Sequence, residues 1–178
     1  DGELRAYLGI WAVITLLIAA NLLFSGTFAT VGDSLRYSAF HSASIMTTTG
    51  FATFDYQLWP SFSQMLLFLL FFVGGSGGST GGGIKVIRIV ALFKMARVQV
   101  KRRIHPRGVF QVRVGQTTLH KELLVAIASF FGIYILTGLV GAALISLSGA
   151  DMMTSLSASF LCLGNIGIGF GQVGPTGS

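Results

Sequence analysis

Two short segments carry residue types that could hold a monovalent cation. Their residues are Thr47, Thr48, Thr49, Gly50, Gly164, Asn165, Ile166 and Gly167. Glycine permits dihedral angles that turn successive backbone carbonyls inwards, and a ring of such carbonyls can replace the water around the ion. Neither segment contains a carboxylate, which argues against a ring of acids selective for divalent cations. We therefore predict that residues 47–50, the first loop segment, and residues 164–167, the second loop segment, belong to an ion filter.

A short helix is predicted before each loop segment. Residues 34–46 and 152–163 are compatible with a helix but are too short to cross a bilayer. Asp33 and Asp151 are placed to cap the two helix N-termini, and the glycine that ends each loop segment follows 17 and 16 positions later. Such a helix points the negative end of its dipole, about half a charge, at a bound cation. The second occurrence of this order favours pore loops over ordinary connections.

A glycine-rich stretch between the two segments interrupts an otherwise apolar span. Its residues, the glycine loop, are Gly74, Gly75, Ser76, Gly77, Gly78, Ser79, Thr80, Gly81, Gly82 and Gly83. Each glycine costs about 1 kcal/mol in a helix relative to alanine. The glycine loop therefore either joins two helices at a surface or breaks one membrane crossing at depth. The second arrangement requires surrounding protein or a water-filled cavity, and so implies a transport path.

Two cations follow the glycine loop, and two interpretations of them stay open. Lys85 and Arg88 could simply begin the cytoplasmic face of the protein. Alternatively, they approach the pore, where their charge would oppose cation passage as a barrier or a gate latch. The residue types alone do not separate these roles.

The composition is that of an integral membrane protein. Mean hydropathy is +0.75, 52% of the residues are hydrophobic and 10% are charged, against about 25% charged in soluble domains. Ten of the twelve Lys and Arg residues lie between Lys85 and Lys121, which marks one cytoplasmic face. Because these cations adjoin apolar spans, membrane lipid is a predicted partner and nucleic acid is not.

No pattern in the chain predicts an enzyme. The sequence shows no nucleophile–base pair and no cluster of metal-ligating side chains. The glycine loop has the glycine spacing of a phosphate-binding P-loop, but Ile84 separates its last glycine from Lys85, and Val86 stands where serine or threonine is required. We therefore predict neither a bound nucleotide nor another organic cofactor in this chain.

Three apolar stretches are predicted to cross the membrane. They are residues 7–24, residues 60–103 with the glycine loop as a break, and residues 119–147. Residues 104–118 predict a short cytoplasmic hairpin between the second and third stretches. The first and third stretches both run from inside to outside, so the two units that they begin are parallel.

Single residues refine these boundaries. Tyr56 and Trp59 are expected as interfacial anchors where the chain returns from the first loop segment. Pro60 suits the first position of the helix that follows. Three glycines in the last span should let another helix approach closely: Gly132, Gly138 and Gly141.

We predict an all-α membrane protein built from parallel span–pore-helix–span repeats with a broken inner helix, plus a short cytoplasmic hairpin. Residues 1–103 form one pore repeat with its span, pore helix, filter and glycine-broken span. Residues 104–118 form the cytoplasmic connection. Residues 119–178 form a second, incomplete pore repeat, because no closing span follows the second loop segment.

These residues resemble the Trk/Ktr family of potassium-uptake proteins over nearly the whole chain. The glycine loop with residues 84–88 closely resembles the broken inner helix of that family's third repeat. The first loop segment with Phe51 resembles the filter of the same repeat, and the second loop segment resembles the filter of the fourth. Residues 105–107, His-Pro-Arg, with the strand that follows resemble the family's cytoplasmic connection.

The resemblance implies channel-like potassium uptake by a multi-pass protein of the cell (inner or plasma) membrane. K+ would bind at the filter and be the transported ion, and the glycine loop would be the intramembrane gating loop beneath it. Four repeats surround one pathway in this family, so either the chain is the C-terminal part of a longer polypeptide that contains the remaining pore repeats, or two copies assemble one pore. The incomplete last repeat favours the longer polypeptide. A homodimer and a cytoplasmic nucleotide-binding regulatory subunit are also implied.

Two other classes of function compete with uptake through a pore. A secondary cation transporter with broken helices, coupled to sodium or protons, often shows inverted repeats and ionisable residues at the midplane. Here the predicted repeats are parallel and their apolar spans carry no acid. A purely structural or assembly subunit would leave the two loop segments unexplained. Uptake through a pore is therefore the leading prediction.

Overall fold

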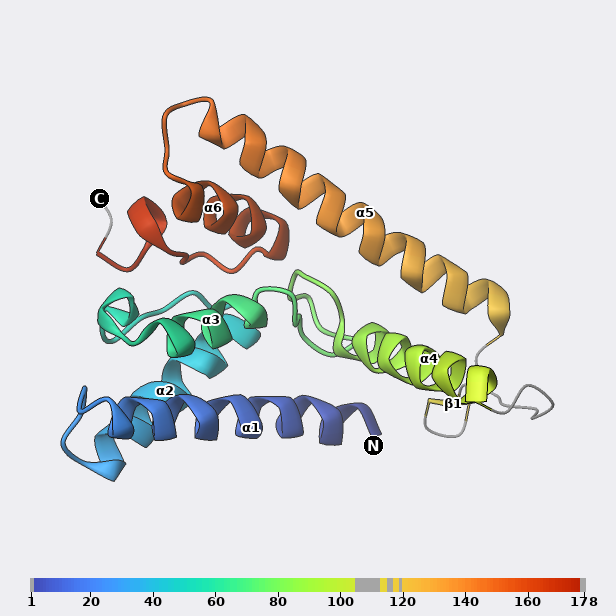
Figure 1. The fold of residues 1–178 in the computed structure, drawn as a ribbon, viewed down its shortest axis with the longest axis horizontal. Coiled ribbons are helices and arrows are strands. Elements are labelled where there is room, and N and C mark those ends of the chain that lie inside the picture. Colours follow the sequence, from blue (N-terminus) through green and yellow to red (C-terminus); the bar gives the residue numbers. More distant parts are fainter. Residues whose placement is uncertain (1, 105–112, 115–116, 119, 177–178) are drawn as a thin grey trace.

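Helices predominate in the computed structural model, which describes residues 2–104, 113–114, 117–118 and 120–176 (Figure 1). The elements in chain order are α1 (Gly2–Phe24), α2 (Val31–Met46), the 3-10 helix η1 (Tyr56–Leu58), α3 (Ser61–Leu70), α4 (Val86–Ile104), β1 (Arg113–Val114), β2 (Thr117–Thr118), α5 (Lys121–Ser146), α6 (Met152–Gly164) and the 3-10 helix η2 (Gly171–Val173). Each of the long helices α1 and α5 leads into a shorter helix that ends at a loop segment.

The first half of the chain packs the long helix α1 against the short helix α2. The helix predicted over residues 7–24 is confirmed and begins earlier, at Gly2. The Thr30 hydroxyl oxygen caps α2 by accepting the backbone N–H of Asp33 at 3.0 Å, and the hydroxyl donates to the Asp33 carboxylate at 2.7 Å. The prediction that Asp33 itself is the cap is therefore wrong. The helix starts three residues sooner, and the Asp33 side chain supports the cap from the first turn.

The second half of the chain packs α5 against α6 in the same order. The helices predicted over residues 119–147 and 152–163 are both confirmed. Asp151 caps α6 as predicted, because its carboxylate accepts the Thr154 hydroxyl and, at 3.2 Å, the Thr154 backbone N–H. These hydrogen bonds to Thr154 hold the pKa of Asp151 below its ordinary value, so the capping carboxylate stays ionised at a lower pH than a free aspartate.

The glycine loop separates two helices, as predicted. α3 ends at Leu70 and α4 begins at Val86. Pro60 is the N-cap of α3, because its ψ of 145° is extended. The prediction that it takes the first helical position is therefore wrong by one residue. A fixed φ with no N–H to satisfy suits this end of a helix in either position.

Two short strands lie within the segment predicted as a hairpin. β1 pairs with β2 in antiparallel register, with Arg113 opposite Thr118 and Val114 opposite Thr117. The other residues of that prediction, 105–112 and 115–116, lie outside the described residues.

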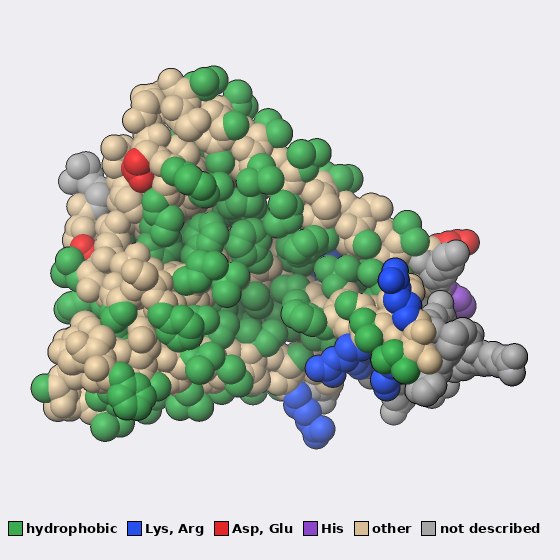
Figure 2. Space-filling view, in the orientation of Figure 1, with side chains coloured by type: hydrophobic (Ala, Val, Ile, Leu, Met, Phe, Trp, Pro, Cys, Tyr) green, Lys and Arg blue, Asp and Glu red, His purple; other side chains and the backbone are tan. Residues whose placement is uncertain are grey.

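Apolar side chains cover much of the molecular surface. Among the residues that the structure describes, two helices, Gly2–Phe24 and Glu122–Ser146, are long and apolar enough to cross a membrane. Only 22% and 11% of their most apolar windows are buried within the chain. Figure 2 shows this hydrophobic surface and the Lys and Arg side chains that gather at one end, around α4. Apolar area on this scale requires lipid or further protein to cover it.

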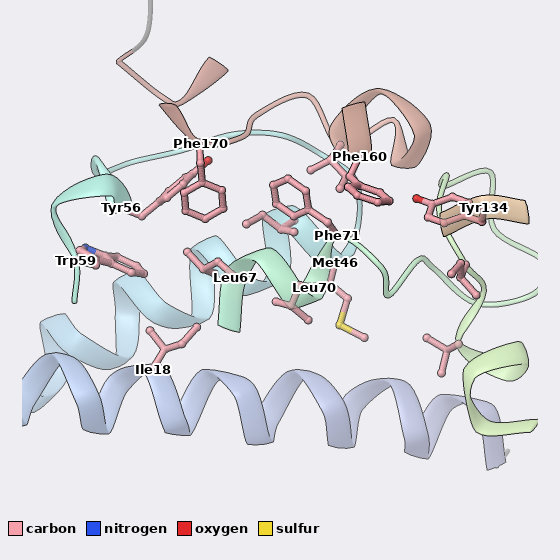
Figure 3. Packing of buried hydrophobic residues seen from close by; sticks show 14 of the residues in the cluster. Ile18, Met46, Tyr56, Trp59, Leu67, Leu70, Phe71, Tyr134, Phe160 and Phe170 are labelled. Atoms are coloured by element: carbon pink, nitrogen blue, oxygen red, sulfur yellow. The ribbon is translucent and has the colours of Figure 1, made fainter. Parts of the chain in front are cut away.

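A buried core joins the two halves of the chain, as Figure 3 shows. Its labelled side chains are Ile18, Met46, Tyr56, Trp59, Leu67, Leu70, Phe71, Tyr134, Phe160 and Phe170. Tyr56 and Trp59 are 0% and 3% exposed. Their rings pack against Phe170 and His41 at centroid distances of 5.1 and 5.0 Å. The prediction that they are interfacial anchors is therefore wrong, because their rings face protein rather than lipid headgroups.

Two of the three glycines of α5 lie where α6 approaches closely. A Cβ built on Gly138 would lie 2.2 Å from the ring of Phe160, and one built on Gly141 would lie 2.5 Å from the Ser159 hydroxyl. The same hydroxyl donates to the Gly138 carbonyl at 2.7 Å. A Cβ on Gly132 would meet no described atom within 4 Å. Close helix contact is thus confirmed at two positions and does not hold for Gly132 within the described residues.

Gly138→Ala should destabilise the packing of α5 on α6. The ring of Phe160 would have to move, and such overpacking typically costs about 1–3 kcal/mol. Gly132→Ala is the matched control, because its side chain meets open space and gains helix propensity of about 1 kcal/mol. Thermal unfolding in detergent should give a lower midpoint for Gly138→Ala and an equal or higher one for Gly132→Ala. The same midpoint for both variants would contradict the close packing.

Candidate ion-binding site and glycine loop

The first loop segment turns its backbone N–H groups back toward α2. The N–H groups of Thr49 and Gly50 donate to the Ser44 carbonyl at 2.9 and 3.4 Å. Thr48 and Gly50 have φ angles of +57° and +76°, in the left-handed region that favours glycine. Within the described part of the chain, the carbonyls of residues 48–50 accept no hydrogen bond. These carbonyls are therefore available to another ligand.

Hydroxyl groups brace this turn. The Ser44 hydroxyl donates to the Phe51 carbonyl at 2.6 Å. The Thr47 hydroxyl donates to the Ala43 carbonyl at 2.7 Å and lies 2.8 Å from the Thr49 hydroxyl. The contacts fix the conformation of the first loop segment without occupying the carbonyls that are predicted to hold an ion.

The second loop segment is built in the same way at the end of α6. The N–H groups of Asn165 and Ile166 donate back to α6 carbonyls at 3.2 and 3.0 Å. Asn165 ends the helix in the left-handed conformation with φ of +52°, and Gly167 has φ of +99°. Among the residues that the structure describes, none donates to the carbonyls of residues 165–167. Both loop segments thus share two features. Their N–H groups donate back to the preceding helix, and their carbonyls accept no hydrogen bond from the described residues.

The structure brings the two loop segments into contact. A Cβ built on Gly50 would lie 2.4 Å from the carbonyl oxygen of Ile166 and 3.2 Å from the Cα of Gly167. Backbone therefore lies directly against backbone, and a side chain at position 50 has no space. The C-terminal ends of α2 and α6 adjoin this contact, and the dipoles of both helices favour a cation there.

The glycine loop lies against both loop segments. A Cβ built on Gly82 would lie 2.1 Å from the carbonyl oxygen of Gly164, at the end of α6. One built on Gly81 would lie 3.1 Å from the Thr48 hydroxyl. Glycine is needed at position 82 because a larger residue would push the glycine loop away from α6.

Backbone hydrogen bonds close the base of the glycine loop. The Gly74 N–H donates to the Ile84 carbonyl at 2.8 Å, and the Val86 N–H donates to the Gly75 carbonyl at 3.3 Å. The segments that enter and leave the loop form an isolated parallel β-bridge between Gly74 and Lys85. The loop is therefore a closed excursion between α3 and α4, not an extension of either helix.

The two cations that follow the glycine loop take different positions. The Lys85 ammonium donates to the carbonyls of Ser79, at 2.8 Å, and Gly81, so it clamps the loop. Arg88 lies over the ring of Phe130, with its guanidinium carbon 4.2 Å from the centroid. This cation–π contact joins the start of α4 to α5. Of the two predicted gate charges, Lys85 contacts the glycine loop and Arg88 contacts a span.

A cavity of about 620 Å³ lies beside the glycine loop. Its lining comes from α1, the first loop segment and the glycine loop: Glu3, Leu4, Tyr7, Thr47, Gly75, Ser76, Gly78, Ser79, Thr80 and Gly81. The Glu3 carboxylate accepts the backbone N–H of Gly77. Sequence reasoning missed Glu3, because an acid in the first turn of a helix is already explained by the helix dipole.

Polar contacts tie together the segments that follow the two loop segments. The Tyr56 hydroxyl donates to the Gly169 carbonyl at 2.5 Å, and the Gly171 N–H donates to the side-chain oxygen of Gln57 at 2.8 Å. Burial raises the pKa of Tyr56, so its hydroxyl stays protonated and remains a donor. These contacts hold the two loop segments in a fixed mutual position, and they were not predicted because they join opposite halves of the chain.

Comparison with known proteins identifies relatives over almost the whole chain. Residues 10–176 match the family model TrkH, described as a cation transport protein. The chain is 34% identical over 173 residues to the Trk system potassium uptake protein TrkH of Salmonella typhimurium, which covers 97% of this chain and 36% of the relative. It is 33% identical over 171 residues to the Trk system potassium uptake protein TrkG of Escherichia coli, and this match covers 96% of this chain and 35% of the relative. The chain spans about a third of the length of these curated relatives.

A solved structure agrees with these matches. The crystal structure of the potassium transporter TrkH from Vibrio parahaemolyticus matches with a TM-score of 0.90 and 36% sequence identity, over 97% of this chain and 37% of that chain. Sequence and fold thus agree over α1 to α6 and both loop segments. The chain therefore belongs to the TrkH family of cation transport proteins.

Proposed function

We propose that the protein takes up potassium ions across the cell membrane through a channel-like pore whose filter includes carbonyls of both loop segments. The observation that carries this proposal is the contact between the two segments at the ends of α2 and α6, with carbonyls that accept no hydrogen bond from the described residues. Such carbonyls can replace the hydration shell of potassium, and the two helix dipoles add negative potential. Potassium is supported by the names of the matched relatives, which are potassium uptake proteins.

Two parallel pore repeats are the proposed architecture. One comprises α1 to α4 and the other α5 and α6. Figure 1 supports this arrangement, because α1 and α5 run in the same direction and each leads into a short helix. Two loop segments do not close a ring, so the remaining pore repeats of a longer polypeptide would supply the other carbonyls. The coverage of about a third of the relatives' length is consistent with this proposal.

The glycine loop is the proposed gate beneath the filter. Its contacts with Gly164 and Thr48 support this assignment, since ions that leave the loop segments on this side would meet it. Non-helical backbone inside a membrane requires surrounding protein or water, and the adjoining cavity of about 620 Å³ provides such surroundings. Lys85 would then act as part of the gate through its hydrogen bonds to the loop.

The basic helix α4 is the proposed cytoplasmic end of the molecule. Its cations gather at one end of the surface in Figure 2, and such residues face the cytoplasm in membrane proteins. A cytoplasmic nucleotide-binding regulatory subunit would bind on this side. The exposed apolar faces of α1 and α5 would contact lipid, the remaining repeats or the second subunit of a homodimer, in a multi-pass protein of the cell membrane.

Rubidium and sodium uptake into proteoliposomes tests the proposed filter. In the complete protein, Gly50→Ser should lower the rubidium-to-sodium uptake ratio by about tenfold, which corresponds to about 1.4 kcal/mol. The serine would have to adopt a φ near +76° and would overlap the Ile166 carbonyl, and the left-handed conformation alone costs about 1–2 kcal/mol.

Gly26→Ser separates the overlap from backbone strain. Gly26 has a similar φ of +70°, but a Cβ there meets no described atom within 4 Å. This variant should keep the parental uptake ratio. Equal uptake of rubidium and sodium by the parent, or a parental ratio for Gly50→Ser, would overturn the filter assignment and leave the family and fold unaffected.

A further inference from the structure

We infer that Glu3 is a positioning residue that holds the tip of the glycine loop, which comprises residues 76–78. Glu3 lies in the first turn of α1, and its carboxylate accepts the backbone N–H of Gly77. Lys85 holds the same loop at a different place, through the carbonyls of Ser79 and Gly81. An acid from α1 and a base that precedes α4 therefore fix the glycine loop at separate points.

The contact with Glu3 has a large influence on the position of the loop, because the tip makes few other contacts with the described residues. A Cβ built on Gly78 would meet no described atom within 4 Å, and the Ser79 N–H bonds locally to the Ser76 carbonyl at 2.9 Å. Glycine-rich backbone loses more conformational freedom on ordering than any other sequence. A hydrogen bond to an ionised acceptor is about twice as strong as a neutral one. One such bond at the tip thus shifts the loop strongly toward its ordered position.

The position of Glu3 also connects the loop to the space beside the first loop segment. Glu3 and Thr47 line the same cavity as the glycine loop, so release of the tip would change that space. The consequence for ion flux rests on the proposed function, in which the glycine loop is the gate. The hydrogen bond between Glu3 and Gly77 depends on the geometry of the contact and not on the identity of the ion.

The rate at which a thiol at the tip is modified measures how firmly Glu3 keeps the tip in place. The complete protein would carry Ser76→Cys as reporter, because Ser76 adjoins Gly77 and lines the cavity beside the glycine loop, so that access of a reagent depends on the position of the tip. The native cysteines, including Cys162, would be replaced by serine. Glu3→Ala should raise the rate of modification by a water-soluble thiol reagent about three- to tenfold, and Glu3→Gln, which keeps a neutral acceptor, should raise it less.

Glu122→Ala is the matched control for this experiment. Glu122 also lies in the first turn of a long helix, α5, so the variant reproduces the loss of a favourable acid at a helix N-terminus. It should leave the modification rate unchanged. A parental rate for Glu3→Ala, or an equal increase for Glu122→Ala, would overturn the inference.

Rubidium uptake by the same variants separates this inference from the proposed function. Faster modification with faster uptake supports both the role of Glu3 and the gate. Faster modification with parental uptake supports the role of Glu3 and removes the glycine loop as the barrier to flux. Parental modification overturns the role of Glu3, whatever the uptake.

Discussion

Gly82→Ala is expected to lower both the stability of the protein and the rubidium-to-sodium uptake ratio. The added Cβ would lie 2.1 Å from the carbonyl oxygen of Gly164 and 3.1 Å from the Cβ of Asn165. The nearest atom belongs to the backbone, so no side-chain rotation relieves the overlap. Either the glycine loop or the second loop segment must move, at a cost of about 1–3 kcal/mol or more. Thermal unfolding in detergent should show a midpoint several degrees lower, and uptake into proteoliposomes should show weaker discrimination.

Gly78→Ala is the comparison within the same loop. A Cβ at this position meets no described atom within 4 Å, and the loss of one glycine reduces the conformational freedom of the unfolded chain. The variant should keep the parental uptake ratio and an equal or slightly higher midpoint. If Gly82→Ala instead retained the parental midpoint and ratio, the glycine loop would not be seated against α6 in the working protein.

Helices and their breaks could be predicted because neighbouring residues mark them. Asp151 caps α6 through a hydrogen bond three residues away. The glycine loop stops a helix through the conformational freedom of its own residues, and the apolar runs of α1 and α5 have the length of a bilayer crossing. Each of these signals acts within a few positions. They therefore do not depend on how the two halves of the chain meet.

The arrangement of the candidate site could not be predicted, because it depends on contacts between distant residues. The matched spacing predicted that the two loop segments have similar structures. It did not predict that they lie in contact, as Gly50 and Ile166 do. Tyr56 has the amphipathic character of an interfacial residue, yet its hydroxyl finds a partner in the other half of the chain. Glu3 has an ordinary local explanation, and its contact with Gly77 follows from the packing of α1 beside the glycine loop.

Lys85→Met should release the glycine loop and raise rubidium uptake about tenfold. The ammonium donates to the Ser79 carbonyl at 2.8 Å and to the Gly81 carbonyl, with the Ser79 hydroxyl at 3.4 Å. Hydrogen bonds to charged groups contribute about 1.5–3 kcal/mol, and about 1.4 kcal/mol changes a population tenfold. Methionine keeps an unbranched apolar stem but removes every donor. Uptake into proteoliposomes at equal protein content measures the effect.

Lys85→Arg distinguishes a hydrogen-bonded clamp from a barrier made by charge alone. Arginine keeps the positive charge, but its planar guanidinium does not reproduce the compact geometry of the ammonium. A barrier of charge predicts parental uptake for this variant, whereas a clamp predicts an increase. Lys101→Met, which removes an exposed cation from α4, should leave uptake unchanged. Parental uptake by Lys85→Met would contradict both roles, because neither the charge nor the hydrogen bonds of Lys85 would then limit the passage of ions.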